Sequence, residues 1–173
     1  MTDLSALTRL CPPPTSPPPT DWESVEGALG RTLPIDYKRI IDAYGSGSFC
    51  GFLRLYQPHA STEWVDIAGP MPTVIRRQLE EDRAQQKNPV PYDPQLLIAI
   101  GVTDNGEYLF WVTDPEDSPD QWTIAVNEAR GPRWFTYDGT LTQFLIALLA
   151  KAVNVPMFPE SLQALDPFFQ PDL

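Results

Sequence analysis

Proline is the residue that most limits where this chain can form regular structure. Its ring fixes φ and removes the amide donor, so a run of prolines excludes helix and the interior of a sheet. The chain has 20 prolines in 173 residues, with triplets at 12–14 and 17–19 and several more after Asn154. These positions predict a single domain over residues 20–153, flanked by a proline-rich arm at 1–19 and a tail at 154–173.

The two flanking segments carry different patterns. Residues 11–20 are expected to form an extended polyproline II spacer. Before it, the spacing of Leu4, Leu7 and Leu10 fits one brief amphipathic turn. The tail keeps enough apolar residues to dock on the domain: Met157, Phe158, Leu162, Leu165, Phe168 and Phe169.

Two helices are predicted early in the domain. Thr20 and Glu23 fit a capping box that starts the first one. Leu33-Pro34 opens the second, because proline is accepted in a first helical turn, and Gly45 stops it. Four apolar residues of the second helix follow the i, i+3, i+4, i+7 spacing of a buried face: Tyr37, Ile40, Ile41 and Tyr44.

A loop at 45–48, a strand at 52–56 and a third helix follow. Pro72 is expected to open that helix, with Val74, Ile75 and Leu79 facing inward. The segment Lys87-Asn88-Pro89 ends it.

From residue 96 the pattern changes to strands. Segments 96–100 and 107–113 flank Asp104-Asn105-Gly106, and Asn-Gly is a strong hairpin signal. The second of these strands is apolar on both faces, which places it centrally with cover on each side. Strands at 122–126 and 133–137 and a helix at 140–153, capped by Thr140 and Gln143, complete the domain. This order predicts an α+β fold, a central and mostly antiparallel sheet packed with several helices.

The charge balance bears on the partner. With 23 acidic and 12 basic residues, the net charge is −11. Such a field repels phosphate groups, so we expect neither nucleic acid nor an anionic membrane as partner. A basic protein is the natural complement, and acidity that serves solubility alone is the alternative.

The remaining features indicate a soluble protein of the cytoplasm. The longest apolar stretch, 144–153, falls short of the roughly 20 residues that a membrane helix needs. The N-terminus lacks the pattern of a secretory signal. Cys11 and Cys50 are not arranged as a C-x-x-C pair and suit a reducing compartment.

No catalytic or metal-binding pattern is found. One histidine, His59, and two cysteines are too few for a zinc site. A P-loop, a dinucleotide fingerprint and a nucleophile elbow are all missing from the sequence. We therefore expect no enzyme activity, no cofactor and no metal. An enzyme that uses His59, with Cys50 nine positions away, remains the alternative.

The densest acidic group lies between two predicted strands. It comprises Asp114, Glu116, Asp117 and Asp120, in a loop that also holds two prolines. The spacing does not match a calcium-binding EF-hand loop. The group is either a solvated loop or a surface offered to a basic partner. If it is a partner surface, Glu107 and Trp64 are secondary candidates for the contact. Trp64 is included because an exposed tryptophan is a favoured interface anchor.

The first part of the domain carries a recognisable pattern. It reads Trp22-x-x-Val25-Glu26-x-x-Leu29-Gly30-x-x-Leu33-Pro34-x-Asp36-Tyr37-Lys38-x-x-Ile41-x-x-Tyr44-Gly45-x-Gly47-x-Phe49. This pattern resembles the SUKH superfamily, which unites bacterial immunity proteins with fungal cell-wall assembly regulators of the Smi/Knr type. The later strands and the final helix are similar too, so the resemblance covers about residues 20–153. The arm and the tail depart from the family pattern.

The resemblance implies a protein-binding role. Bacterial members of the family commonly bind and block a cognate toxin, often a nuclease or deaminase. We therefore expect an immunity protein that occludes a basic, nuclease-like toxin domain. A regulatory or scaffolding interaction module, like the fungal relatives, is the alternative, and in that case the proline-rich arm would be needed for partner binding.

Overall fold

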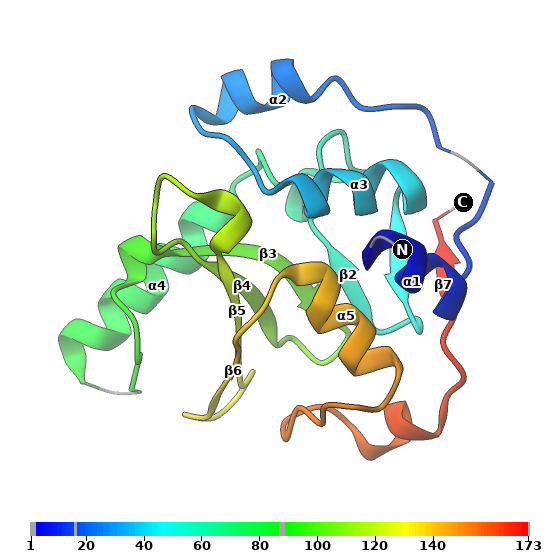
Figure 1. Ribbon diagram of the computed structural model, residues 1–173. Helices are drawn as coiled ribbons and strands as arrows, with labels where there is room; N and C mark the ends of the chain where they lie inside the picture. The colour runs from blue at the N-terminus through cyan, green and yellow to red at the C-terminus, as the bar shows by residue number, and fades with distance from the viewer. Residues whose placement is uncertain (1–2, 16, 87–88, 173) are drawn as a thin grey trace.

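The computed structural model describes residues 3–15, 17–86 and 89–172. Within them the α-helices are α1 (Asp3–Leu10), α2 (Trp22–Leu29), α3 (Ile35–Tyr44), α4 (Met71–Gln85) and α5 (Leu141–Leu149). The strands are β1 (Gly47–Phe49), β2 (Leu53–Leu55), β3 (Leu97–Thr103), β4 (Tyr108–Val112), β5 (Thr123–Asn127), β6 (Trp134–Tyr137) and β7 (Phe169–Pro171). They form one sheet in the order β6-β5-β4-β3-β2-β1-β7, and every neighbouring pair is antiparallel (Figure 1). The expected α+β architecture is confirmed.

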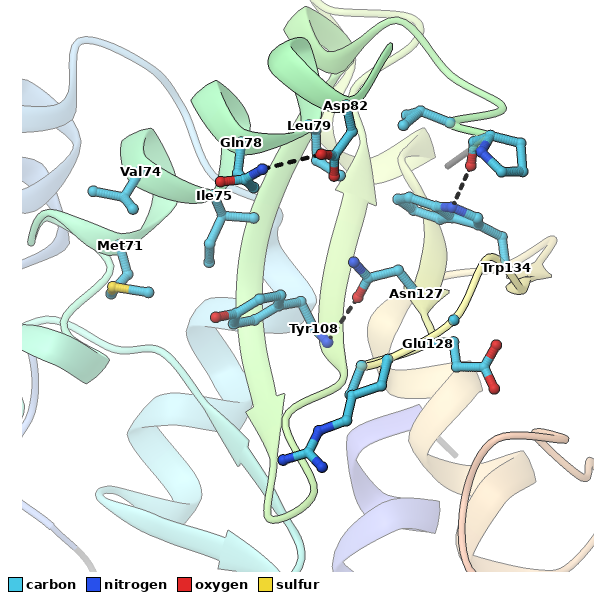
Figure 2. Close-up of a pocket in the computed structure, with 15 residues that line it drawn as sticks. Met71, Val74, Ile75, Gln78, Leu79, Asp82, Tyr108, Asn127, Glu128 and Trp134 are labelled. Atoms are coloured by element: carbon cyan, nitrogen blue, oxygen red, sulfur yellow. Dashed lines mark hydrogen bonds between the residues drawn. The ribbon is translucent and has the colours of Figure 1, made fainter. Parts of the chain in front are cut away.

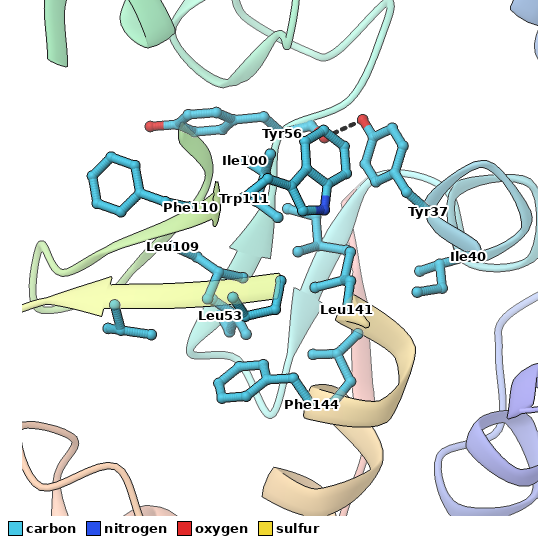
Figure 3. Packing of buried hydrophobic residues seen from close by; sticks show 14 of the residues in the cluster. Tyr37, Ile40, Leu53, Tyr56, Ile100, Leu109, Phe110, Trp111, Leu141 and Phe144 are labelled. Atoms are coloured by element: carbon cyan, nitrogen blue, oxygen red, sulfur yellow. Dashed lines mark hydrogen bonds between the residues drawn. The ribbon is translucent and has the colours of Figure 1, made fainter. Parts of the chain in front are cut away.

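The two faces of the sheet are covered differently. Side chains alternate along β4, so Trp111 and Phe110 lie on opposite faces. The Trp111 ring packs edge-on against Tyr37 of α3, with ring centroids 5.0 Å apart, on the face that α5 also covers (Figure 3). On the other face Phe110 contacts Trp134, and α4 packs along β3. The prediction of a central strand covered on each side is confirmed.

The tail completes the sheet. Strand β7 pairs with β1, and the Asp172 carboxylate binds the Arg54 guanidinium at 2.6 Å. A Cβ atom at Gly47 would overlap the Gln170 carbonyl oxygen and the Phe169 ring, so only glycine lets β7 come this close. The tail is therefore docked, with Val155, Phe158 and Leu162 buried.

The arm also reaches the core. In α1, Leu7 is fully buried, as is Cys11 just after the helix, and α1 contacts both α5 and α3. The Tyr44 hydroxyl donates to the Cys11 carbonyl oxygen at 2.6 Å. The prolines that follow thus connect two packed elements, and the first of these elements is a full helix instead of a brief turn.

Two expected details at the ends of elements are wrong. Helix α2, the first helix predicted within the domain, has no Thr20–Glu23 capping box. Instead, the Asp21 side chain accepts a hydrogen bond from the Ser24 N–H and caps this helix. The last helix ends at Leu149 and not near residue 153. The chain turns there through Lys151, which has a positive φ of 63° and donates to two carbonyl oxygens of the tail.

Two further expectations fail because of how the elements pack in the folded chain. Residues 47–49, expected in part as a loop, form β1 because the tail supplies a partner strand. Val74 was expected inward but is 48% exposed, since α4 turns only Ile75 and Leu79 fully toward the sheet. The expected helix stop includes Lys87 and Asn88, which lie outside the described residues.

Candidate protein-interaction surface

The sequence pattern around Leu33-Pro34 builds structure. The Glu26 carboxylate accepts from the Leu33 N–H at 2.6 Å and forms an ion pair with Lys38 at 3.1 Å. The buried Tyr37 hydroxyl donates to the Tyr56 carbonyl oxygen at 2.6 Å (Figure 3), and burial raises the pKa of Tyr37. Asp36 accepts from the N–H and the hydroxyl of Thr142, at 2.9 and 2.8 Å, and so caps the first turn of α5. These contacts hold the helices and the sheet together.

The acidic loop (residues 114–120) connects β4 to β5 and is anchored to the rest of the protein. Its Asp120 carboxylate accepts from the Ile35 N–H at 2.8 Å, at the first residue of α3. At its other end, the Trp122 indole donates to the Pro115 carbonyl oxygen at 2.9 Å. These two bonds hold the loop in place beside the N-terminus of α3.

The four carboxylates of this loop are not equivalent. All four are exposed, but Asp120 is engaged at α3. Asp114, Glu116 and Asp117 make no ion pair within the described part of the chain. Glu116 and Asp117 border a cleft of about 280 Å³, together with Arg31 and Trp122. Three negative charges are therefore presented to solvent from one anchored loop.

The two secondary candidates lie elsewhere. Glu107, proposed as a partner contact, is only 4% exposed and accepts from the Thr103 hydroxyl at 2.9 Å. That expectation needs correction, because a buried and bonded carboxylate within the β3–β4 turn has little surface to offer. Trp64 is 58% exposed, as expected, but it belongs to the connection between β2 and α4.

Arg31 was not found by sequence reasoning. Its guanidinium carbon lies 5.9 Å from the centre of the Trp122 ring, a cation–π contact. The only local signal is a basic residue just before Leu33-Pro34, and nothing in the sequence indicates that Trp122, far along the chain, is its neighbour.

A second concave surface lies between α4 and the face of the sheet that carries Phe110 and Trp134 (Figure 2). This groove has a volume of about 440 Å³, and its apolar lining includes Val74, Ile75, Tyr108 and Trp134. The Trp134 indole donates to the Pro89 carbonyl oxygen at 3.0 Å, and both residues line the groove. Sequence reasoning missed this surface because it depends on how α4 crosses the sheet.

The groups considered for chemistry differ in exposure. His59 is exposed, with a positive φ of 53°. Cys11 and Cys50 are both buried; burial, and then the neighbouring Cys50, raise the pKa of Cys11 to about 11. In the ranges that the structure describes, no group of three or more His, Cys, Asp or Glu side chains is placed to hold a metal ion. No helix in these ranges is long and apolar enough to span a bilayer.

Comparison with known families finds a match over most of the chain. The SUKH_6 family model, described as SMI1-KNR4 cell-wall, matches residues 19–145. The chain belongs to the SUKH family. Comparison with curated proteins and with solved structures gave no significant match.

The SUKH match covers most of the described elements. It begins just before α2 and ends within α5, so it includes the whole Leu33-Pro34 pattern and the acidic loop. Helix α1 and strand β7 lie outside it. Both of these elements nevertheless pack on the matched part of the chain.

Proposed function

We propose that this SUKH protein is a cytoplasmic, non-catalytic immunity protein that binds and blocks a basic, nuclease-like toxin domain. The supporting observation is the trio Asp114, Glu116 and Asp117, three exposed carboxylates without ion pairs among the described residues, on a loop anchored at both ends. The family includes immunity proteins as well as fungal regulators, and both act through protein partners.

Electrostatics favours this assignment. A nuclease must carry positive charge to hold its substrate, and a net charge of −11 attracts such a protein. Complementary charge raises association rates, and it adds affinity where charges meet at short range. Because the loop is already anchored, little conformational entropy is lost when a partner orders it.

The test compares two triple variants. In the first, Asp114→Asn, Glu116→Gln and Asp117→Asn remove the loop charges and leave Asp120 at its structural position. In the second, Glu81→Gln, Glu160→Gln and Asp166→Asn remove three exposed charges elsewhere. Both variants lower the net negative charge by three, so they differ only in where the charge is lost.

The test begins with the reading frame next to the one that encodes this chain, which the proposal expects to encode a large secreted protein. The binding partner is the C-terminal domain of that protein, and a neighbouring frame without such a product would count against the proposal. We expect the loop variant to bind that domain at least about tenfold more weakly, with a reduced salt dependence. The control variant should lose only a small part of the association rate. Equal affinities of the two variants would show that the loop is not the contact surface.

A further inference from the structure

Two arginines face one cavity. Arg31, from the connection between α2 and α3, and Arg76, from α4, both line a pocket of about 250 Å³. Thr73, in the first turn of α4, lines it as well. The remaining wall is largely apolar: Leu29, Leu33, Ile67, Ala68, Gly69, Pro72 and Ile98. The pocket thus combines apolar walls with two arginine side chains.

Neither arginine has a carboxylate partner among the described residues. Arg76 donates through Nε and Nη2 to the Leu97 carbonyl oxygen, at 3.4 and 3.1 Å, which fixes its side chain. Arg31 stacks on Trp122, and its Nη1 atom is buried without a hydrogen-bond partner in the described ranges. A buried donor that lacks an acceptor is costly, and more so when it is charged.

The charges around the pocket leave the two cations largely unbalanced. Burial is the main cause that lowers the pKa of Arg76, the charge of Arg31 lowers it further, and Glu80 partly opposes both. The Glu80 carboxylate accepts a hydrogen bond from Gln95. Glu116 and Asp117 border the neighbouring cleft that Arg31 also lines, yet neither forms an ion pair with it. In a chain with 23 acids, two such arginines facing one pocket indicate an external anion.

We propose that Arg31 and Arg76 form a binding site for an oxyanion, a carboxylate or a phosphate, carried on a small apolar group. Guanidinium forks match the planar oxygen pairs of these anions and bind them through two parallel hydrogen bonds. Thr73 adds a hydroxyl donor, and the walls from Leu33, Ile67 and Ile98 cover the apolar part of the ligand. This site would bind anions, whereas the acidic loop is proposed to bind a basic protein. The anion site does not depend on the proposed immunity function.

Titration of the full chain with benzoate and with inorganic phosphate tests this site. Calorimetry is carried out at constant ionic strength, with chloride as the reference anion. We expect saturable binding of at least one probe, and about tenfold weaker binding by Arg31→Gln. Tighter binding of benzoate indicates a carboxylate ligand, and tighter binding of phosphate indicates a phosphate ester. Arg77→Gln, on the exposed side of α4, is the matched control and should bind like the original chain.

Two outcomes would overturn the proposal: no saturable binding of either probe, or unchanged binding by Arg31→Gln. If that variant does not fold, an NMR titration of the unaltered chain tests the site through the Nε–Hε resonances of Arg31 and Arg76. They must shift together and saturate with the anion. The loop variant Asp114→Asn, Glu116→Gln, Asp117→Asn should keep anion binding, so failure of this site and failure of the immunity proposal are separable.

Discussion

At the scale of single residues, acidic side chains of similar sequence context do different things. Asp120 accepts from the first N–H of α3, whereas Asp117, three positions earlier, is exposed and makes no ion pair in the described chain. Glu107, in the turn before β4, is buried and bonded to Thr103. The difference arises from what lies opposite each carboxylate, and this depends on distant parts of the chain.

This difference predicts a stability contrast within the loop. Asp120→Ala removes a side-chain acceptor from the N-terminus of α3, and such losses cost about 1 kcal/mol. Asp117→Ala removes only an exposed charge and should change stability by less than about 0.5 kcal/mol. Urea unfolding monitored by tryptophan fluorescence measures both. Equal midpoints for the two variants would contradict a capping role for Asp120.

At the scale of elements, the ends of the sheet depend on pairing across the chain. Strand β1 is short and has β2 on one side and β7 from the tail on the other. The Arg54–Asp172 ion pair and a hydrogen bond from the Ser46 hydroxyl to Asp172 secure that tail strand. Bonds from Arg54 are the main cause that lowers the pKa of Asp172.

The docking of β7 should therefore depend on pH in acid. A carboxylate with a lowered folded-state pKa stabilises the fold fully above its ordinary value of about 3.9. That contribution is lost as the pH falls through the lowered value of Asp172. Hydrogen exchange should show the amides of β7 losing protection in this range before those of β4. Asp172→Asn should weaken β7 protection already at neutral pH, and Asp166→Asn, at an exposed site, should not.

At the scale of the whole molecule, segments outside the family match take part in the core. Helix α1 places Leu7 in the same buried cluster as residues of α3 and α5. Deletion of residues 1–19 therefore removes core packing and cannot by itself distinguish an immunity protein from a regulatory module. Alanine substitution of the exposed prolines Pro12, Pro18 and Pro19 makes that distinction without opening the core.

Leu7→Ala tests whether α1 belongs to the cooperative unit. Large-to-small changes at fully buried leucines cost about 2–5 kcal/mol, and Leu7 has 0% exposure. Pro18→Ala, at an exposed position in the connecting segment, should stay within about 0.5 kcal/mol. Thermal or urea unfolding of both variants measures the difference. A neutral Leu7→Ala would mean that α1 packs too weakly to contribute to folding.

The amino-acid sequence by itself determined the local elements of this protein. Helical spacing and capping placed α3 and α5, and two continuous apolar runs separated by an Asn-Gly turn placed the β3–β4 hairpin. These features depend on neighbouring residues, whose hydrogen bonds and side-chain directions follow from the backbone period. The SUKH pattern can be recognised in the sequence because most of its residues belong to α2 and α3, whose structure depends on neighbouring residues.

Tertiary structure alone decided the rest. Strand β1 exists because β7 pairs with it, Asp120 caps a helix far away in the sequence, and Arg31 meets Trp122 and Arg76 only in the folded chain. Such contacts depend on how elements pack across a core, and a local pattern carries no information about its distant neighbours. Tertiary structure also decided the exposure of the acidic loop and the formation of the arginine pocket. The two proposals depend on these two surfaces.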